Sequence, residues 1–373
     1  MKIIFLIDQI YKHGGGEKVL TEKASYFADE LGYHVTIITT EQRRKKPCYT
    51  LSDKVSLIDI DVSYERTKSY FSIRNITKIA YHYKALKKQI KEINPDFIIL
   101  LSDAFDYYFL PYVSDKSKIL KEFHSSYYFN AIEKEKNKSL LTKAKFFIRD
   151  YINNKYDYLV VLNDDEKKLL NVNNIVVIPN GITIDQSELS TLENKRVISA
   201  GRIVPVKNFE ALIQSWKYIE DKYPDWHLEI YGGGDREYLS QLQELIKELN
   251  LTNSICMCGS TNHLRDKMLN ASIYVMSSIT ECFPMVLLEA QSCGLPIVSF
   301  NCPYGPRNII TDKKDGLLIE NQNNFKLANG IIKLIESKNL REEMSRNTKI
   351  NIKKYKFDEV MEEWKKLFES KHT

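Results

Sequence analysis

Short, nearly continuous apolar runs alternate with amphipathic segments along the first half of the chain. These runs are KIIFLID, HVTIITT, DFIILL, SKILKEFH, YLVVLN and IVVIP. A solvent-facing sheet would show alternating polar positions, so these runs are typical of parallel strands that are buried on both faces. With helices between them, they predict a doubly wound α/β domain.

The alternation stops at the polar stretch QSELSTLENKR, residues 186–196, and then starts again. The second series of runs is RVISAG, HLEIYG, SICMCG, SIYVMSS, PIVSF and DGLLI. We therefore expect two Rossmann-like domains of similar kind and a helical tail. The predicted organisation is an N-terminal domain at 1–186, a linker at 187–196, a C-terminal domain at 197–350, and a C-terminal helix at 351–373 that packs back on the N-terminal domain.

Composition and cysteine usage exclude several classes of protein. The 373 residues are 43% hydrophobic and 28% charged, and the net charge of +5 is too small to indicate nucleic acid. The opening MKIIFLID is too short for a signal peptide, and no run reaches the roughly 18 apolar residues of a membrane span, so we expect a cytoplasmic protein. Six scattered cysteines predict free thiols, and the C-x-C pair Cys256 and Cys258 lacks the second pair that a metal site needs.

Two parallel sheets in tandem predict a ligand in the cleft between them, held by loops at the carboxyl ends of the strands. HGGGEKVL places Gly14, Gly15 and Gly16 before a helix, where backbone amides can approach an anion; a turn without a ligand is the alternative. A dinucleotide motif would need a third glycine where Val19 stands, so NAD is not expected, although Glu41 occupies the place of a ribose-binding acid.

Charged residues follow two strands of the second series. Arg202 and Lys207 come after RVISAG and before a helix. The planar guanidinium of Arg202 and the ammonium of Lys207 could therefore converge on a diphosphate. Glu281 precedes a helix that starts near Pro284, and Glu289 lies on that helix, so two carboxylates could hold hydroxyls at the two ends of an elongated ligand. Each of these residues, taken alone, could equally be an ordinary surface charge.

Taken together, these residues resemble the motif set of glycosyltransferase family 4, a family of retaining transferases with the two-domain GT-B architecture. The matching motifs are GRIVPVKN at 201–208, ECFPMVLLEA at 281–290, IPNGI at 178–182 and YGGGD at 231–235. The match covers nearly all of the C-terminal domain and only scattered points of the N-terminal domain.

The resemblance implies a role for each matching residue. Arg202 and Lys207 would neutralise the diphosphate, and the catalytic residues would be Arg202, Lys207, Glu281 and His124. Glu281 would contact the hydroxyls of the transferred sugar, and Glu289 would contact the ribose hydroxyls. The other donor-binding positions would be Gly14, Gly15, Gly16, Phe283, Pro284 and Gly233.

Two further positions bear on the contacts with the donor sugar. In similar enzymes a histidine of the first domain contacts the donor sugar; His124 in KEFHSSYY is the best match, and His13 is the rival. The family usually has glycine after the first glutamate of the pair, where this chain has Cys282. A positive φ at that position would strain the cysteine, so we expect an ordinary backbone conformation there.

The resemblance also implies the reaction and its partners. A GT-B enzyme of this kind, with two Rossmann-like domains that face a central cleft, would move a hexosyl or N-acetylhexosaminyl group with retention from a nucleotide sugar, expected to carry UDP. The departing phosphate would help to deprotonate the acceptor, and no metal or other cofactor is expected. SFNCPYGPRNIITDKKDGLL resembles a stretch of bacterial capsule, exopolysaccharide and lipopolysaccharide transferases, which implies a lipid-linked glycan acceptor.

Four other interpretations are compatible with parts of the sequence. Asp59-x-Asp61 matches the pattern of a metal-dependent transferase, but it ends an early strand far from the phosphate-binding loops. A sugar-nucleotide epimerase would share the architecture without an acceptor. An NAD-dependent oxidoreductase is disfavoured by the glycine spacing, and a non-catalytic protein that binds nucleotide sugars could keep the same loops.

A basic and aromatic segment at residues 43–91 indicates peripheral attachment to the inner face of the cell membrane. Its apolar stripe is expected at Ile76, Ile79, Ala80, Tyr83 and Ile90, and a stripe that packs on its own domain is the alternative. Cations beside aromatic residues suit anionic lipid headgroups. The cations are Arg43, Arg44, Lys45, Lys46, Arg66, Lys68, Arg74, Lys78, Lys84, Lys87, Lys88 and Lys91, and the aromatic residues are Tyr64, Tyr70, Phe71, Tyr81 and Tyr83.

Overall fold

The computed structural model of the chain describes residues 1–69, 72–113, 116–185 and 187–370. Its internal contacts divide the chain into two compact units. The first unit is Met1–His124 with Phe129–Ile178, and the second is Ser125–Tyr128 with the chain from Pro179 onward. No helix in the described part of the chain is both long enough and apolar enough to cross a membrane.

The first unit is built on a seven-stranded sheet in the order β3-β2-β1-β4-β5-β6-β7. Every neighbouring pair is parallel, and the six apolar runs of the first half all form strands. The strands are β1 Lys2–Ile7, β2 His34–Thr39, β3 Ser56–Asp59, β4 Phe97–Leu100, β5 Lys118–Glu122, β6 Tyr158–Val161 and β7 Ile175–Val177. All four residues of β4 are buried, as expected for a central strand that is covered on both faces.

Helices connect these strands. They are α1 Gly15–Asp29, α2 Ile73–Ile93, α3 Asp106–Phe109, α4 Tyr128–Lys136, α5 Leu140–Asn153 and α6 Asp164–Leu169, with the 3₁₀ turn η1 Leu110–Tyr112 after α3. Side-chain caps explain where two of them begin: Ser139 accepts a hydrogen bond from the amide of Thr142 at the start of α5, and Asn163 accepts one from Glu166 at the start of α6.

The second unit has a six-stranded parallel sheet in the order β10-β9-β8-β11-β12-β13. The strands are β8 Arg196–Ala200, β9 His227–Tyr231, β10 Ile255–Gly259, β11 Ile273–Met276, β12 Ile297–Phe300 and β13 Gly316–Ile319. The six apolar runs of the second series are therefore also confirmed as strands.

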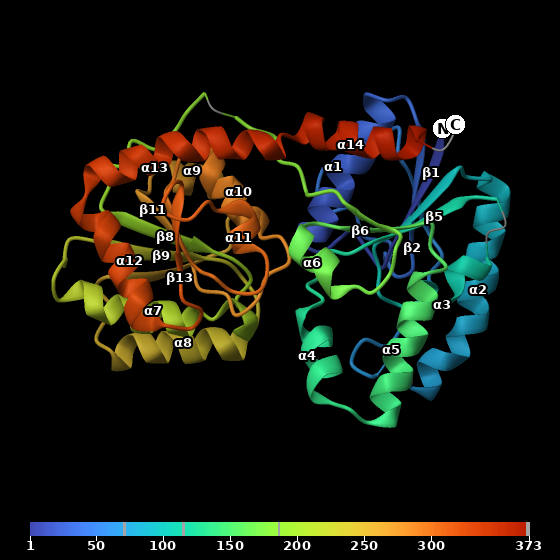
Figure 1. The fold of residues 1–373 in the computed structure, drawn as a ribbon, viewed down its shortest axis with the longest axis horizontal. Coiled ribbons are helices and arrows are strands. Elements are labelled where there is room, and N and C mark those ends of the chain that lie inside the picture. The colour runs from blue at the N-terminus through green and yellow to red at the C-terminus, as the bar shows by residue number, and fades with distance from the viewer. Residues whose placement is uncertain (70–71, 114–115, 186, 371–373) are drawn as a thin grey trace. The chain divides into compact units, whose positions relative to one another are not determined.

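Helices cover both faces of this second sheet. In Figure 1, α7, α8 and α12 lie on one face and α9 and α10 on the other. The helices are α7 Phe209–Glu220, α8 Arg236–Glu248, α9 Leu264–Leu269, α10 Met285–Ser292, α11 Pro306–Ile309, α12 Asn324–Glu336, α13 Lys338–Asn351 and α14 Phe357–Glu369, with the 3₁₀ turns η2 Pro205–Lys207 and η3 Ile352–Tyr355. A continuous core beneath α7, α8 and α12 includes the fully buried Trp216, Leu242 and Ile331.

The predicted fold class, two doubly wound Rossmann-like domains, is confirmed. The contacts separate the units after Ile178, whereas the sequence analysis placed the boundary after residue 186, which lies outside the described residues. The predicted tail helix at 351–373 is not one helix: residue 351 ends α13, and the 3₁₀ turn η3 and then α14 follow, which group with the second unit. The last three residues of the predicted tail helix, 371–373, are likewise outside the described residues.

Candidate functional site

A cation and a carboxylate meet at the carboxyl ends of two neighbouring strands of the second unit. Lys207 ends η2, the short turn that follows β8, and Glu281 lies in the loop that follows β11. Strands β8 and β11 are hydrogen-bonded neighbours, with Ile273 opposite Val197. Lys207 Nζ lies 2.5 Å from Glu281 Oε1, and both side chains are only partly exposed. Two predicted site residues that are 74 positions apart are therefore in direct contact.

The loop that carries Glu281 is held by hydrogen bonds along its backbone. The amide of Glu281 donates to the carbonyl of Pro303, and the amides of Tyr304 and Gly305 donate to the carbonyl of Glu281. The hydroxyl of Ser278 donates to Glu281 Oε1 at 2.6 Å, so both side-chain donors use the same oxygen. Within the described residues Oε2 has no hydrogen bond, so it can accept one from a ligand hydroxyl.

Arg202 lies in the loop that directly follows β8, and its side chain is exposed. It makes no ion pair or side-chain hydrogen bond with any residue that the structure describes. The amide of Ile203 donates to the carbonyl of Gly233, which joins this loop to the YGGGD loop after β9. A Cβ on Gly232 would lie 1.8 Å from the carbonyl oxygen of Gly201, so only glycine allows the two loops to approach this closely. The predicted donor-binding residue Gly233 thus lies beside Arg202.

Helix α10 begins directly after the Glu281 loop, with Pro284 as its N-cap and no side-chain cap. The amide of Leu287 donates to the carbonyl of Pro284, whereas those of Met285 and Val286 remain available to an anion. Glu289 lies on this helix and is partly exposed. Phe283 is buried, and its ring packs edge-on against Tyr355 with the centroids 5.6 Å apart, so its side chain supports the loop.

Cys282 is buried, and its φ is not positive. The backbone at this position is therefore ordinary, and the cysteine side chain causes no strain in place of the usual glycine.

In the first unit the glycine loop and His124 lie close together. Gly14 is the N-cap of α1, which begins at Gly15, two residues before the expected start. A Cβ built on Gly16 would lie 4.0 Å from Cγ of His124, so the imidazole borders the first turn of α1. A Cβ on Gly15 would meet nothing within 4 Å. The rival His13, which directly precedes the three glycines, has Nδ1 3.0 Å from Sγ of Cys48 and its ring edge-on to Tyr49.

Beside His124 is a buried ion pair that the sequence analysis missed. Lys23 Nζ lies 2.5 and 2.7 Å from the two carboxylate oxygens of Glu122, and both side chains are 1% exposed. His124 Nε2 lies 3.1 Å from Glu122 Oε1, although off the direction that a hydrogen bond requires. Burial alone would raise the pKa of Glu122, but the charge of Lys23 and then His124 hold that pKa well below its ordinary value. Burial lowers the pKa of Lys23 against the opposing effect of Glu122.

The residue before Glu122 is also a buried charge, on the other face of β5. Lys121 Nζ lies 2.9 Å from Asp103 Oδ1 and donates to the carbonyls of Leu101 and Ser102. The signal for both charges is present in the sequence, because Lys121 and Glu122 interrupt an otherwise apolar run. Buried charges in such a run need partners, which predicts an ion pair on each face.

A second group of charges lies at the carboxyl ends of β1, β2 and β3. Arg66 Nη2 lies 2.9 Å from Asp8 Oδ2 and 2.8 Å from Glu41 Oε1. Burial raises the pKa of Asp8 to about 6, against the opposing charge of Arg66. The carboxylate of Glu41 is thus engaged by Arg66, which leaves the interpretation as a ribose-binding acid without support.

The aspartates of the D-x-D pattern are engaged in a turn. The carboxylate of Asp59 accepts hydrogen bonds from Thr39 and from the amides of Arg43 and Asp61, and the carboxylate of Asp61 accepts one from the hydroxyl of Ser63. These contacts tie the Asp59 carboxylate to the end of β2 and the loop that follows it, and the Asp61 carboxylate to its own loop.

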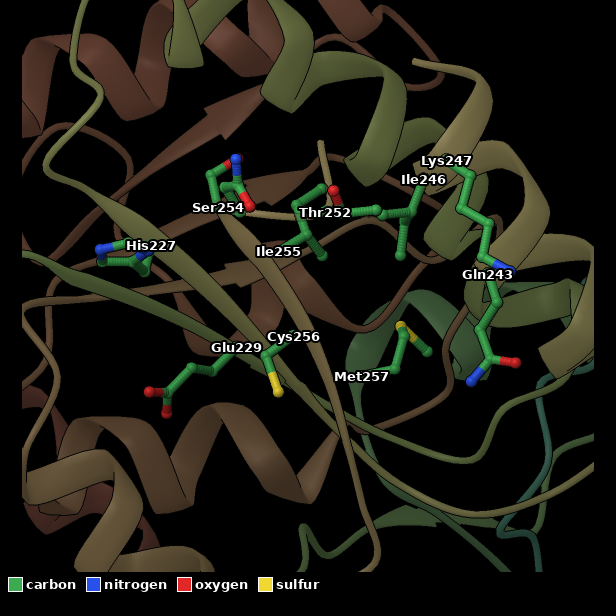
Figure 2. A pocket seen from close by; sticks show the side chains of 11 residues that line it. His227, Glu229, Gln243, Ile246, Lys247, Thr252, Ser254, Ile255, Cys256 and Met257 are labelled. Atoms are coloured by element: carbon green, nitrogen blue, oxygen red, sulfur yellow. The ribbon is translucent and has the colours of Figure 1, made fainter. Parts of the chain in front are cut away.

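The second unit also contains a cavity of about 610 Å³ that is separate from these loops. Figure 2 shows it between β9, the edge strand β10 and α8, with His227, Glu229 and Cys256 on one side and Gln243 and Lys247 on the other. It extends to His227 and Ile255, the first residues of their strands, whereas Lys207 and Glu281 lie at the carboxyl ends. The cavity is therefore not part of the candidate site.

Two family models match the chain, one for each half. The model described as "Glycosyl transferases group 1" matches residues 182–351, and the model described as "Glycosyltransferase Family 4" matches residues 13–186. An "Uncharacterized glycosyltransferase" of Haemophilus influenzae is 31% identical over 98% of this chain and 99% of its own length. The "Amylovoran biosynthesis glycosyltransferase AmsD" of Erwinia amylovora is 24% identical over 97% and 98% of the two chains.

A solved structure shows the same architecture. The pneumococcal O-GlcNAc transferase GtfA, determined in complex with UDP and GlcNAc, is 16% identical, covers 99% of both chains and has a TM-score of 0.77. The fold inferred from the apolar runs is thus that of GT-B glycosyltransferases. With models that match residues 13–351 and a full-length relative at 31% identity, the chain belongs to glycosyltransferase family 4.

Proposed function

We propose that the protein is a retaining glycosyltransferase that moves a hexosyl or N-acetylhexosaminyl group from a UDP-sugar to a lipid-linked glycan in bacterial surface polysaccharide biosynthesis. Membership of the family supports the transfer reaction, and the amylovoran relative supports a polysaccharide product. UDP in the complex of the pneumococcal transferase supports a uridine nucleotide as the leaving group. We further propose that the protein works at the inner face of the cell membrane, where such an acceptor would be found.

The contact between Lys207 and Glu281 carries this proposal. A carboxylate that accepts from both Lys207 and Ser278 is fixed in place, and its second oxygen is left for a sugar hydroxyl. Lys207 has three N–H donors and uses one for Glu281, so the others can reach phosphate oxygens. With the exposed guanidinium of Arg202 on the preceding loop, the same strand ends present donors to a diphosphate and an acceptor to a sugar.

The chemistry follows from where charge develops. As the bond between the anomeric carbon and the diphosphate oxygen breaks, negative charge grows on the diphosphate and positive character grows on the sugar ring. Fixed cations at Arg202 and Lys207 stabilise the leaving group in that transition state. In the front-face transfer that we propose, the acceptor oxygen bonds to the anomeric carbon on the side that the diphosphate leaves, and its proton passes to a phosphate oxygen.

Donor hydrolysis tests the proposal without knowledge of the acceptor. The protein is incubated with a panel of UDP-, GDP- and ADP-sugars, and the released nucleoside diphosphate is measured. We expect release from at least one UDP-sugar, loss of that activity in Lys207→Ala, and full activity in the control Lys217→Ala, which removes an exposed lysine from α7. No hydrolysis of any donor, or equal activity in the two lysine variants, would overturn the proposal.

A further inference from the structure

Helix α5 of the first unit carries an apolar face that is largely exposed, with the Tyr151 ring partly covered by Lys155. The exposed fractions are 83% for Leu140, 85% for Leu141, 73% for Phe147, 51% for Ile148 and 48% for Tyr151. Single exposed apolar residues are common on protein surfaces, but a contiguous apolar patch indicates an interaction.

These side chains form one stripe because of their spacing. At 3.6 residues per turn, positions 140, 141, 144, 147, 148 and 151 fall within an arc of roughly 120°. The opposite side of the helix packs on its own unit: Phe146 and Asn153 are buried, and the hydroxyl of Tyr107 donates to Asn153 Oδ1 at 2.6 Å. The helix is therefore held in one rotation about its axis, with the stripe outward. We call the side chains of Leu140, Leu141, Ala144, Phe147, Ile148 and Tyr151 the α5 surface.

The α5 surface is bordered by positive charge. Lys143 and Lys145 flank the two edges of the arc, and both are exposed. Residues 128–155 contain seven basic and three acidic residues, a net charge of +4. Two of the acids are paired with lysines, Glu133 with Lys145 at 2.7 Å and Asp150 with Lys134 at 3.4 Å. The basic residues are Lys134, Lys136, Lys138, Lys143, Lys145, Arg149 and Lys155.

Helix α4 holds α5 from the side. In Figure 1 the two green helices lie beside one another, and Arg149 Nη1 donates to Asn130 Oδ1 at 2.8 Å across them. The ammonium of Lys134 lies 5.6 Å from the centre of the Phe146 ring. The stripe thus belongs to a packed pair of helices and not to a free segment.

We propose that the α5 surface docks the protein on a bilayer that contains anionic lipids, which deepens the membrane-associated function proposed above and rests on it. The apolar stripe enters the boundary between headgroups and acyl chains, and the flanking lysines contact the headgroups. A second copy of the chain is a poorer occupant, because pairing two α5 surfaces would bring two clusters of net charge +4 together.

The segment that the sequence analysis indicated for this role is a weaker candidate. On α2, Ile76 and Ala80 are exposed, but Ile90 is buried, Ile79 and Tyr83 are half-buried, and the Tyr83 ring packs against Phe109. Arg66 is engaged by Asp8 and Glu41, which removes it from contact with lipid. Tyr70 and Phe71 lie outside the described residues.

Sedimentation with sucrose-loaded vesicles tests the proposal on the full chain. One set of vesicles contains only phosphatidylcholine, and the other contains phosphatidylcholine with about 30–40% of the anionic lipid phosphatidylglycerol. We expect binding to the anionic vesicles that weakens as salt rises. The variant Leu141→Asn/Phe147→Asn should bind at least about tenfold more weakly, because it removes two of the largest apolar side chains that would enter the bilayer. The control Phe325→Asn/Ile350→Asn replaces similarly exposed apolar residues of the second unit and should bind like the parent protein.

Two further measurements keep the outcomes distinct. Circular dichroism and donor hydrolysis without vesicles should be unchanged in the α5 variant, since the change is on the surface. Vesicle binding without donor hydrolysis in the parent protein would refute the proposed function and leave the α5 surface standing. Equal vesicle binding by the α5 variant and the parent protein would overturn the inference. So would light scattering that shows a dimer for the parent protein and a monomer for the α5 variant.

Discussion

The buried pair of Lys23 and Glu122 gives a sharp prediction about stability. Both side chains are 1% exposed, so removal of either partner leaves an uncompensated charge in the core of the first unit. Such changes cost about 3–5 kcal/mol, and we expect this cost for Lys23→Met and for Glu122→Leu. The double variant K23M/E122L replaces both charges with apolar groups of similar size, so its free energy of unfolding should be close to that of the parent or above it. The two substitutions should therefore be coupled by about 6–10 kcal/mol, the sum of the two single costs.

Calorimetry of the first unit's transition measures this coupling. For a unit of this size, each kcal/mol corresponds to about 2–4 °C, so each single variant should melt about 6–20 °C lower while the double variant recovers. Because the pKa of Glu122 is held below its ordinary value, the pair stabilises the fold at neutral pH and loses this effect as the pH falls below about 4. The double variant should lack that acid sensitivity. If the loss of unfolding free energy in the double variant equals the sum of the two single losses within about 0.5 kcal/mol, the assignment of a coupled buried pair is refuted.

The remaining predictions concern the donor site. Glu289→Ala should raise the Michaelis constant for the donor, whereas Lys207→Ala should mainly lower turnover, because only Lys207 is assigned to charge that grows in the transition state; equal binding defects in steady-state kinetics would contradict this division. Arg202→Lys should lower kcat/KM by about tenfold or more, since an ammonium cannot reproduce the planar fork, and activity near the parent level would argue against a diphosphate contact. Donor hydrolysis should persist in excess EDTA after metal-free preparation, and activity that returns only with Mn²⁺ would point to metal-dependent chemistry.

The fold could be predicted because burial leaves a direct trace in the sequence. Strands covered on both faces must be apolar throughout, so runs such as DFIILL and SIYVMSS identify central strands without knowledge of their partners. The order of strands within each sheet leaves no such trace. The contact between Lys207 and Glu281 depends on β8 and β11 being neighbours, which only the folded sheet shows. The sequence therefore identified both residues but not their ion pair.

Helix α5 illustrates a different limit. The spacing of Leu140, Phe147 and Ile148 shows which side of the helix is apolar, but the same spacing serves a helix packed on a core and one left exposed. Only the opposite face, buried through Phe146 and Asn153, reveals that the apolar stripe is turned outward. For the same reason the spacing on α2 predicted an exposed apolar stripe, whereas the structure exposes only Ile76 and Ala80 of that stripe and partly or fully buries Ile79, Tyr83 and Ile90.

The consecutive charges Lys121 and Glu122 also restrict how β5 can assemble. Successive residues of a strand point to opposite faces, so a slip of one position would bring Lys121 toward Lys23 and Glu122 toward Asp103. Like charges would then face each other on both sides of the sheet, and the repulsion would be strongest between Lys121 and Lys23, whose side chains are each 1% exposed and little screened by water. In a sheet of uniformly apolar strands, where neighbouring registers bury similar side chains, this pair of charges makes one alignment of β5 far more favourable than the next.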